Sequence, residues 1–209
     1  MLTAATGQNA SLPAAAVVAA CALVFTVLSF WWLNARQGRL YAYAPHSFAA
    51  TITEERISIL LPLVVFNSGP KPIIVQDMRL VFLRSGVSLP WHATREKLRV
   101  VKGDEVHLPS VFAVNGRTAQ QIFVEFGAAF PLTLPEPEAQ DVIIECKMGH
   151  RSRWVGVLKF PLLMGNIWSP ANYVGYSNTI AVVDVAKIQQ GRAEFERLKK
   201  MAQSAARAD

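Results

Sequence analysis

An uninterrupted apolar run near the start of the chain is the strongest pattern in the sequence. Residues 12–33, LPAAAVVAACALVFTVLSFWWL, contain no charged side chain, and Thr26 and Ser29 are their only uncharged polar residues. At a rise of about 1.5 Å per residue, a helix of this length crosses a hydrocarbon core of about 30 Å. Trp31 and Trp32 fall at its end, where amphipathic rings favour the headgroup region. The pattern predicts a transmembrane helix over residues 12–33.

The segments that flank this run predict how it is used. A cleavable signal peptide has a basic N-terminal region and a small-residue cleavage site. Residues 1–11, MLTAATGQNAS, contain no Lys or Arg, and the run ends in Phe-Trp-Trp-Leu, which favours an uncleaved, single-pass anchor in the cell membrane. Arg36 and Arg39 follow within the expected tether, residues 34–46, so the positive-inside rule predicts a cytoplasmic C-terminal domain. An extracytoplasmic domain stays open, because tethered β-domains are often displayed outside the cytoplasm.

From residue 47 to residue 183, short apolar runs with a period of two are separated by turn signals. NSGPKP (67–72) and VNGR (114–117) are two such signals. The side chains expected to face a core along two of the runs are Ile74, Met78, Leu80, Phe82, Val142, Ile144, Cys146 and Met148. About seven short strands without interleaved helices predict a mainly β fold. We expect an antiparallel, immunoglobulin-like β-sandwich over residues 47–183.

One segment of this region resembles a known structural unit. VVFNSGPKPIIV (64–75) looks like the strand, Asn-x-Gly turn, strand unit of several immunoglobulin-like bacterial adhesion-type and desiccation-associated sandwich families. The resemblance covers about a dozen residues, and an Asn-x-Gly turn between two apolar strands is a common hairpin solution. It implies a fold and no chemistry, so no functional residue follows from it.

The C-terminal segment, residues 184–209, changes to a helical pattern. Asp184 is a suitable N-cap, and Gly191 weakens the helix from within. The apolar positions with heptad-like spacing are Ile188, Phe195, Leu198, Ala202 and Ala205. The pattern predicts an amphipathic helix that packs on the β-domain or projects into solvent. Self-association or contact with a membrane surface is the alternative use of its apolar stripe.

The composition and net charge of the chain restrict the classes of function that fit it. Hydrophobic residues make up 52% and charged residues 17% of the chain, and much of the apolar bias lies in residues 12–33, so the remainder is compatible with an ordinary soluble fold. The formal net charge is +6 and the pI is about 9.6. Nucleic-acid binders share this balance, but the basic residues are scattered and no RNP, zinc-finger or phosphate-loop pattern occurs. The charge therefore favours a basic surface near a membrane over a nucleic-acid partner.

No pattern in the chain indicates a catalytic, cofactor or metal site. The four histidines are His46, His92, His107 and His150. None is spaced from another, or from a cysteine, as metal ligands are, and no G-x-S-x-G, H-E-x-x-H or Walker pattern occurs. Cys21 lies in the apolar run and Cys146 in an expected strand, so a disulfide framework is not expected. The prediction is a non-enzymatic protein without a cofactor or a bound metal.

The segment GVSLPWHATREKLRV (86–100) supplies the candidate contact residues for a partner. Trp91, His92 and Arg95 would form such a surface if Trp91 were exposed, whereas the alternative places Trp91 over the edge of the sandwich. Together, the anchor and the motif-free β-domain predict binding or scaffolding at the membrane face, with the lipid bilayer and a protein as partners. The alternative function is a ligand-binding or sensory module on the outer face of the membrane.

Overall fold

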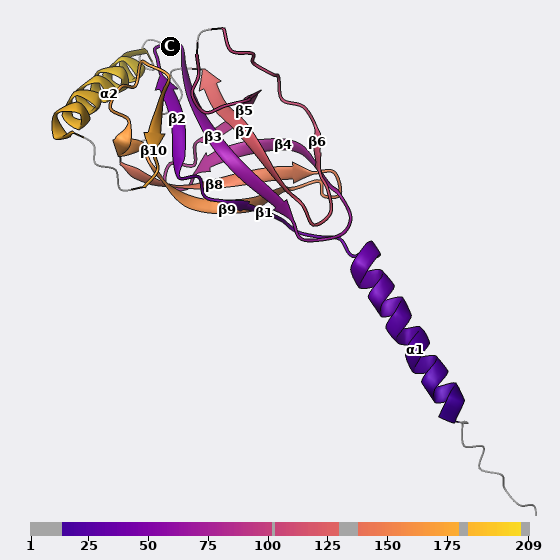
Figure 1. Cartoon of the computed structure of the whole chain (residues 1–209). Coiled ribbons are helices and arrows are strands. Elements are labelled where there is room, and N and C mark those ends of the chain that lie inside the picture. Colours follow the sequence, from indigo (N-terminus) through magenta and orange to yellow (C-terminus); the bar gives the residue numbers. More distant parts are fainter. Residues whose placement is uncertain (1–13, 102, 130–137, 180–183, 206–209) are drawn as a thin grey trace, which may run out of the picture.

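The computed structural model describes residues 14–101, 103–129, 138–179 and 184–205, and it consists of one projecting helix, a β-domain and a second helix (Figure 1). Helix α1 (Ala14–Phe30) continues into a π-helical turn, η1 (Trp31–Ala35), and together these 22 residues are long and apolar enough to span a membrane. The described part of α1 buries no side chain in the rest of the chain, as expected of a helix whose surroundings are lipid. The predicted tail, residues 1–11, lies outside the described residues.

The described residues between the two helices form a ten-stranded antiparallel sheet. Its strands are β1 (Leu40–Tyr43), β2 (Ser47–Ile52), β3 (Arg56–Asn67), β4 (Ile73–Phe82), β5 (Ser88–Arg95), β6 (Phe112–Val114), β7 (Ala119–Ala129), β8 (Ala139–Met148), β9 (Trp154–Leu163) and β10 (Val174–Ser177). The strand order is β10-β2-β3-β7-β5-β4-β8-β9, while β1 pairs with β3 and β6 pairs with β4. The expected mainly β class, with an apolar helix before it and a helix after it, is confirmed.

The way in which the sheet bends differs from the expected immunoglobulin-like sandwich. Such a sandwich keeps its strands in two sheets, whereas this sheet curls into a half-barrel (Figure 1). Strand β5 connects the two parts: its first half pairs with β4 and its second half pairs with β7. The register shifts between Trp91 and Ala93. Because a bulge bends a strand and increases its twist, β5 carries the sheet around the corner.

The core lies on the concave side of the half-barrel, and the period-two pattern of the sequence correctly predicted most of the core side chains that it singled out. Seven of the eight side chains expected there are buried: Met78, Leu80, Phe82, Val142, Ile144, Cys146 and Met148. The expectation for Ile74 was wrong, because this side chain is 39% exposed while Ile73 and Val75 are buried. A register shift between Val75 and Asp77 inverts the alternation within β4.

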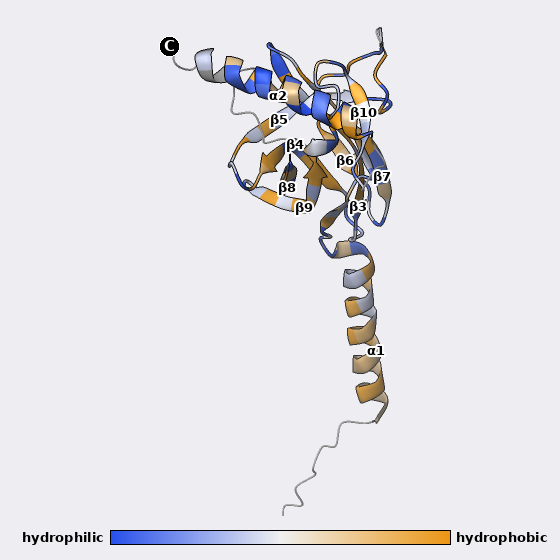
Figure 2. Ribbon diagram, turned by 90° about the vertical axis from the view of Figure 1, so that its left-hand side faces the viewer, coloured by the Kyte–Doolittle hydropathy of each residue, from blue (hydrophilic) through white to orange (hydrophobic). Residues whose placement is uncertain are grey.

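Helix α2 (Val185–Ala205) packs against the end of the β-domain opposite to α1 (Figures 1 and 2). Asp184 caps it, since its Oδ1 accepts a hydrogen bond of 3.0 Å from the backbone N–H of Ala186. Phe195 and Leu198 are buried in the core, and Figure 2 shows the helix as mostly hydrophilic elsewhere. A Cβ atom at Gly191 would lie 2.6 Å from the carbonyl oxygen of Ile167. The glycine that weakens the isolated helix is therefore the point of its closest approach to the domain.

Candidate functional site: the membrane-facing end of the β-domain

Four segments from distant parts of the sequence meet at the end of the β-domain that adjoins α1. They are residues 36–39, the β3–β4 loop (67–72), the β6–β7 turn (115–118) and the β8–β9 turn (149–153). Strand β1 (Leu40–Tyr43) begins inside the tether expected over residues 34–46, so from here on the tether means residues 36–39. We call the four segments the membrane-facing end, because they adjoin the helix that is long and apolar enough to span a membrane. Backbone hydrogen bonds join the first three: the N–H of Ser68 donates to the carbonyl oxygen of Arg39 over 3.1 Å, and the N–H of Arg117 donates to that of Gly69 over 2.9 Å. The side chain of Arg117 also donates to the carbonyl oxygen of Leu33 in the middle of the π-helical turn.

Asn67 holds this end together from a fully buried position. Its Nδ2 donates to the carbonyl oxygens of Lys71, at 2.8 Å, and Val114, at 3.1 Å, while its Oδ1 accepts from the N–H of Gly69. Strands β3 and β4, which flank this Asn-x-Gly segment, are not hydrogen-bonded to each other. The segment therefore acts as a crossing between the two parts of the sheet, and not as a hairpin turn.

The tether is packed directly on this loop. A Cβ atom at Gly38 would collide with the backbone nitrogen of Gly69, and one at Gly116 would collide with the carbonyl oxygen of Pro70. Real side chains do not approach so closely, so both positions require glycine. The domain is thereby fixed to the chain only three residues beyond Ala35, where the π-helical turn ends.

The membrane-facing end is strongly basic. It carries Arg36, Arg39, Lys71, Arg117, Arg151 and Arg153, and its four segments contain no Asp or Glu. The six positive charges of these residues equal the formal net charge of +6 of the chain. The other 15 Lys and Arg residues therefore balance the 15 Asp and Glu residues. None of the six forms an ion pair within the described residues, whereas Arg79, Arg95, Lys97 and Lys159 do. The surplus charge is concentrated where the chain leaves α1.

The predicted interface residues lie together at this junction. Trp31 and Trp32 are 52% and 55% exposed, and the guanidinium of Arg36 stacks on the Trp32 ring at 4.1 Å from its centroid. The N–H of Arg36 donates to the carbonyl oxygen of Trp31 and closes the π-helical turn. An indole with a stacked guanidinium combines an apolar body with a charged edge, which suits the boundary between acyl chains and headgroups.

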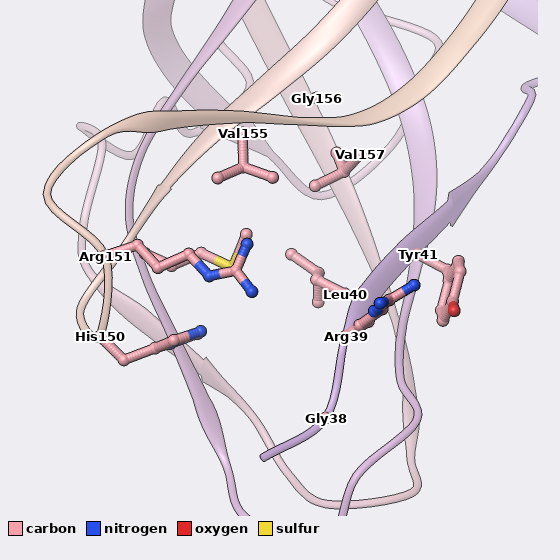
Figure 3. Close-up of a pocket in the computed structure, with 10 residues that line it drawn as sticks. Gly38, Arg39, Leu40, Tyr41, His150, Arg151, Val155, Gly156 and Val157 are labelled. Carbon is pink, nitrogen blue, oxygen red and sulfur yellow. The ribbon is translucent and has the colours of Figure 1, made fainter.

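A pocket of about 350 Å³ opens at the membrane-facing end between β1 and β9 (Figure 3). Leu40, Met148, Val155 and Val157 give it apolar walls, and Arg39, His150 and Arg151 line it with nitrogen atoms. Arg151 and His150 project into it from the β8–β9 turn, while Arg39 lies across from them beside Tyr41 (Figure 3). Burial, and then the charge of Arg151, lower the pKa of His150. The pocket is therefore a site of positive potential with an apolar interior.

The predicted partner-contact residues do not form one exposed surface. Trp91 is only 6% exposed, and its indole N–H donates to the carbonyl oxygen of Ala93 at 2.9 Å, so the premise that Trp91 is exposed was wrong. It alternates with the buried Leu89 along β5 and packs in the core. His92 is exposed on the opposite face.

Arg95, the third of these residues, is used within the domain. Its Nε donates to Oε2 of Glu125 over 2.5 Å, and the two side chains are 9% and 0% exposed. Burial acts to lower the pKa of Arg95, but the hydrogen bond and charge of Glu125 outweigh it, and the pKa is raised. Its guanidinium also lies 5.4 Å from the centre of the Tyr173 ring. Arg95 thus neutralises a buried carboxylate and is not available for a partner.

Sequence reasoning identified Arg36 and Arg39 but missed the other four basic residues of the membrane-facing end. The loop and turns that contain these four residues have no Asp or Glu, and this feature is visible in the sequence: the residues are Lys71, Arg117, Arg151 and Arg153. What the sequence does not display is that the turns meet. Within the described ranges, no three His, Cys, Asp or Glu side chains gather as metal ligands would.

Comparisons with known proteins add little to this description. No protein-family model and no curated protein matches the chain. Among solved structures, the crystal structure of a protein from Archaeoglobus fulgidus aligns with 70% of this chain and 100% of its own, at 12% sequence identity and a TM-score of 0.29. A likeness of that size supports no inference about this chain.

Proposed function

We propose that this chain is a single-pass membrane protein whose β-domain serves a non-enzymatic binding or scaffolding role on the anionic, cytoplasmic face of the membrane. The observation that carries the proposal is the concentration of the whole net charge, without acidic partners among the described residues, at the end that adjoins α1. Anionic lipids of the cytoplasmic leaflet attract such a surface. The basic surplus then faces lipid, and a nucleic-acid partner is not needed to explain it.

The length of the tether supports this arrangement. The packed Gly38 is the third residue after Ala35, so the two lie at most about 11 Å apart even when the chain is fully extended. The headgroup layer adds about 5–7 Å on each side of the hydrocarbon core. With α1 in the bilayer, the membrane-facing end lies within reach of the lipid phosphates and cannot move far from them.

The six basic residues of the membrane-facing end would have two effects: they would orient α1 in the membrane, and they would attract the domain to anionic lipids. Arg36 and Arg39 are close enough to α1 to act during insertion, whereas the other four basic residues join them only after the domain has folded. Each Lys or Arg near an anionic surface contributes about 1 kcal/mol at most, so the six together contribute several kcal/mol. On a leaflet without anionic lipid this contribution is absent.

The test is the topology of the full chain, read by a reporter fused after residue 209. We expect a cytoplasmic reporter, and we expect Arg36→Gln with Arg39→Gln to increase the fraction of inverted chains. The matched control is Arg192→Gln with Arg197→Gln, which removes the same charge from the exposed face of α2 at the opposite end. A reporter found outside the cytoplasm would refute the proposal and favour the sensory or ligand-binding module on the outer face.

A further inference from the structure

The pocket between β1 and β9 is the open end of a seam in the half-barrel. Among the described residues β1 pairs with β3 and β9 pairs with β8, but β1 and β9 do not pair with each other. Away from the membrane, the side chain of Asn178 closes the seam. It donates to the carbonyl oxygens of Pro45 and Pro161, each at 3.1 Å, and accepts from the N–H of Leu163 at 2.9 Å. The seam is therefore clamped at its far end and hollow at the end that faces the lipid.

We propose that this pocket binds the phosphate of an anionic lipid headgroup, with Arg39 and Arg151 as its main ligands and His150 as an additional donor. This inference rests on the proposed function only in placing the pocket at the membrane surface. Guanidinium groups form paired, charge-assisted hydrogen bonds with phosphate oxygens. Both guanidiniums are free of ion pairs within the described part of the chain, so they are available for an anion.

The walls of the pocket favour a lipid over a free phosphate ion. Leu40 and Met148 are buried at its base, and Val155 and Val157 form its β9 side. A hydrated phosphate ion gains nothing from these surfaces, whereas the glycerol and first acyl carbons of a phospholipid displace water from them. A volume of about 350 Å³ accommodates a headgroup with its glycerol but not a whole lipid, so the acyl chains would remain in the bilayer.

The position of the pocket agrees with this ligand. Its lining begins at Gly38 and Arg39, at the end of the short tether, and it therefore opens near the level at which lipid phosphates lie. His150 stands beside Arg151, whose charge helps to keep the imidazole neutral. A bound phosphate would offset the charges of Arg39 and Arg151 that surround His150, so we expect the ligand to raise the pKa of His150.

The test measures lipid binding to the detergent-purified full chain by native mass spectrometry, with phosphatidic acid and phosphatidylcholine as probes. We expect a preference for phosphatidic acid that falls at least tenfold in Arg39→Gln and in Arg151→Gln. Arg153→Gln is the matched control, because Arg153 lies in the same turn and carries the same charge but does not line the pocket. We expect it to change the preference by less than threefold.

Three outcomes would overturn the inference. Equal losses in Arg151→Gln and Arg153→Gln would show that diffuse charge, and not the pocket, selects the lipid, although the proposed orientation would stand. Inorganic phosphate that competes as well as short-chain phosphatidic acid would assign the site to a soluble anion. An unchanged His150 imidazole resonance on addition of short-chain phosphatidic acid would place the lipid elsewhere. All three arginines are exposed, so circular dichroism of the variants should match that of the unaltered chain.

Discussion

The buried ion pair of Arg95 and Glu125 gives the sharpest prediction for the stability of the β-domain. Replacing Arg95 by Met leaves the carboxylate of Glu125 without a counter-charge at a position that is 0% exposed. The Tyr173 hydroxyl lies beside this carboxylate, but it carries no charge, because burial raises the pKa of Tyr173, so it does not replace the guanidinium. At an effective dielectric constant of about 20, charges about 4 Å apart attract by about 4 kcal/mol. Measured losses for breaking buried pairs are about 3–5 kcal/mol.

The assay is pulse proteolysis of the full chain in urea, which reports the free energy of unfolding. We expect Arg95→Met to lower that free energy by about 3–5 kcal/mol. This loss is large, because the free energy of unfolding of a typical domain is only about 5–15 kcal/mol. Arg95→Met with Glu125→Leu removes both charges and should recover most of the loss, since an apolar pair of similar volume avoids the desolvation of two ions. The effect therefore depends on the uncompensated charge and not on the missing contacts of Arg95.

The chain contains its own control for this reasoning. Arg79 and Glu145 form a pair at 2.6 Å on the outside of the sheet, with side chains 35% and 22% exposed. Solvent screens such pairs, and Arg79→Met should cost only about 1 kcal/mol or less. Equal losses in Arg79→Met and Arg95→Met would refute the argument that burial makes the Arg95 pair essential.

Three further predictions concern other parts of the domain. Gly191→Ala should lower the melting temperature of the full chain, although alanine is the better helix former by about 1 kcal/mol, because the new methyl group would meet the carbonyl oxygen of Ile167. Tyr173→Phe should lower the free energy of unfolding by less than about 1 kcal/mol, because the buried hydroxyl lies beside Glu125 and Arg95 but forms no hydrogen bond of good geometry among the described residues. In a Cys21→Ser background, Cys146 should resist maleimide at pH 8 until urea unfolds the domain. Burial raises the pKa of this thiol from 9.0 to about 12, so about a thousandfold less thiolate is present; rapid labelling without urea would contradict its buried position.

The sequence was informative wherever a strand follows a regular period of two. In β8, Val142, Ile144, Cys146 and Met148 alternate without interruption, and all four are buried as predicted. In β4 a register shift moved Ile74 outward, and in β5 a shift after Trp91 places Ala93 opposite Glu125. A bulge depends on pairing with strands that are distant in the sequence, so local alternation does not reveal it.

The same limit applies to the outer face of the sheet. Glu125 alternates with the inward-facing Val124 and Phe126, a pattern that usually points a side chain to solvent. It is fully buried instead, and its strand partners Leu60 and Ala93 are buried with it, so this part of the sheet is covered on both sides. The basic charge of the membrane-facing end was not predicted for a related reason, because its four short segments form one surface only when the chain folds.

The packed tether also links the β-domain to the mechanics of the bilayer. Because Gly38 is packed against Gly69, we expect a tilt of α1 to rotate the β-domain with it instead of being absorbed by a flexible hinge. A membrane-spanning helix tilts more in a thin bilayer than in a thick one. Membrane thickness would then determine which side of the membrane-facing end contacts the headgroups. It would also determine how far the pocket between β1 and β9 lies from them. A change of lipid chain length, with no change in headgroup, would in this way alter what the domain can bind.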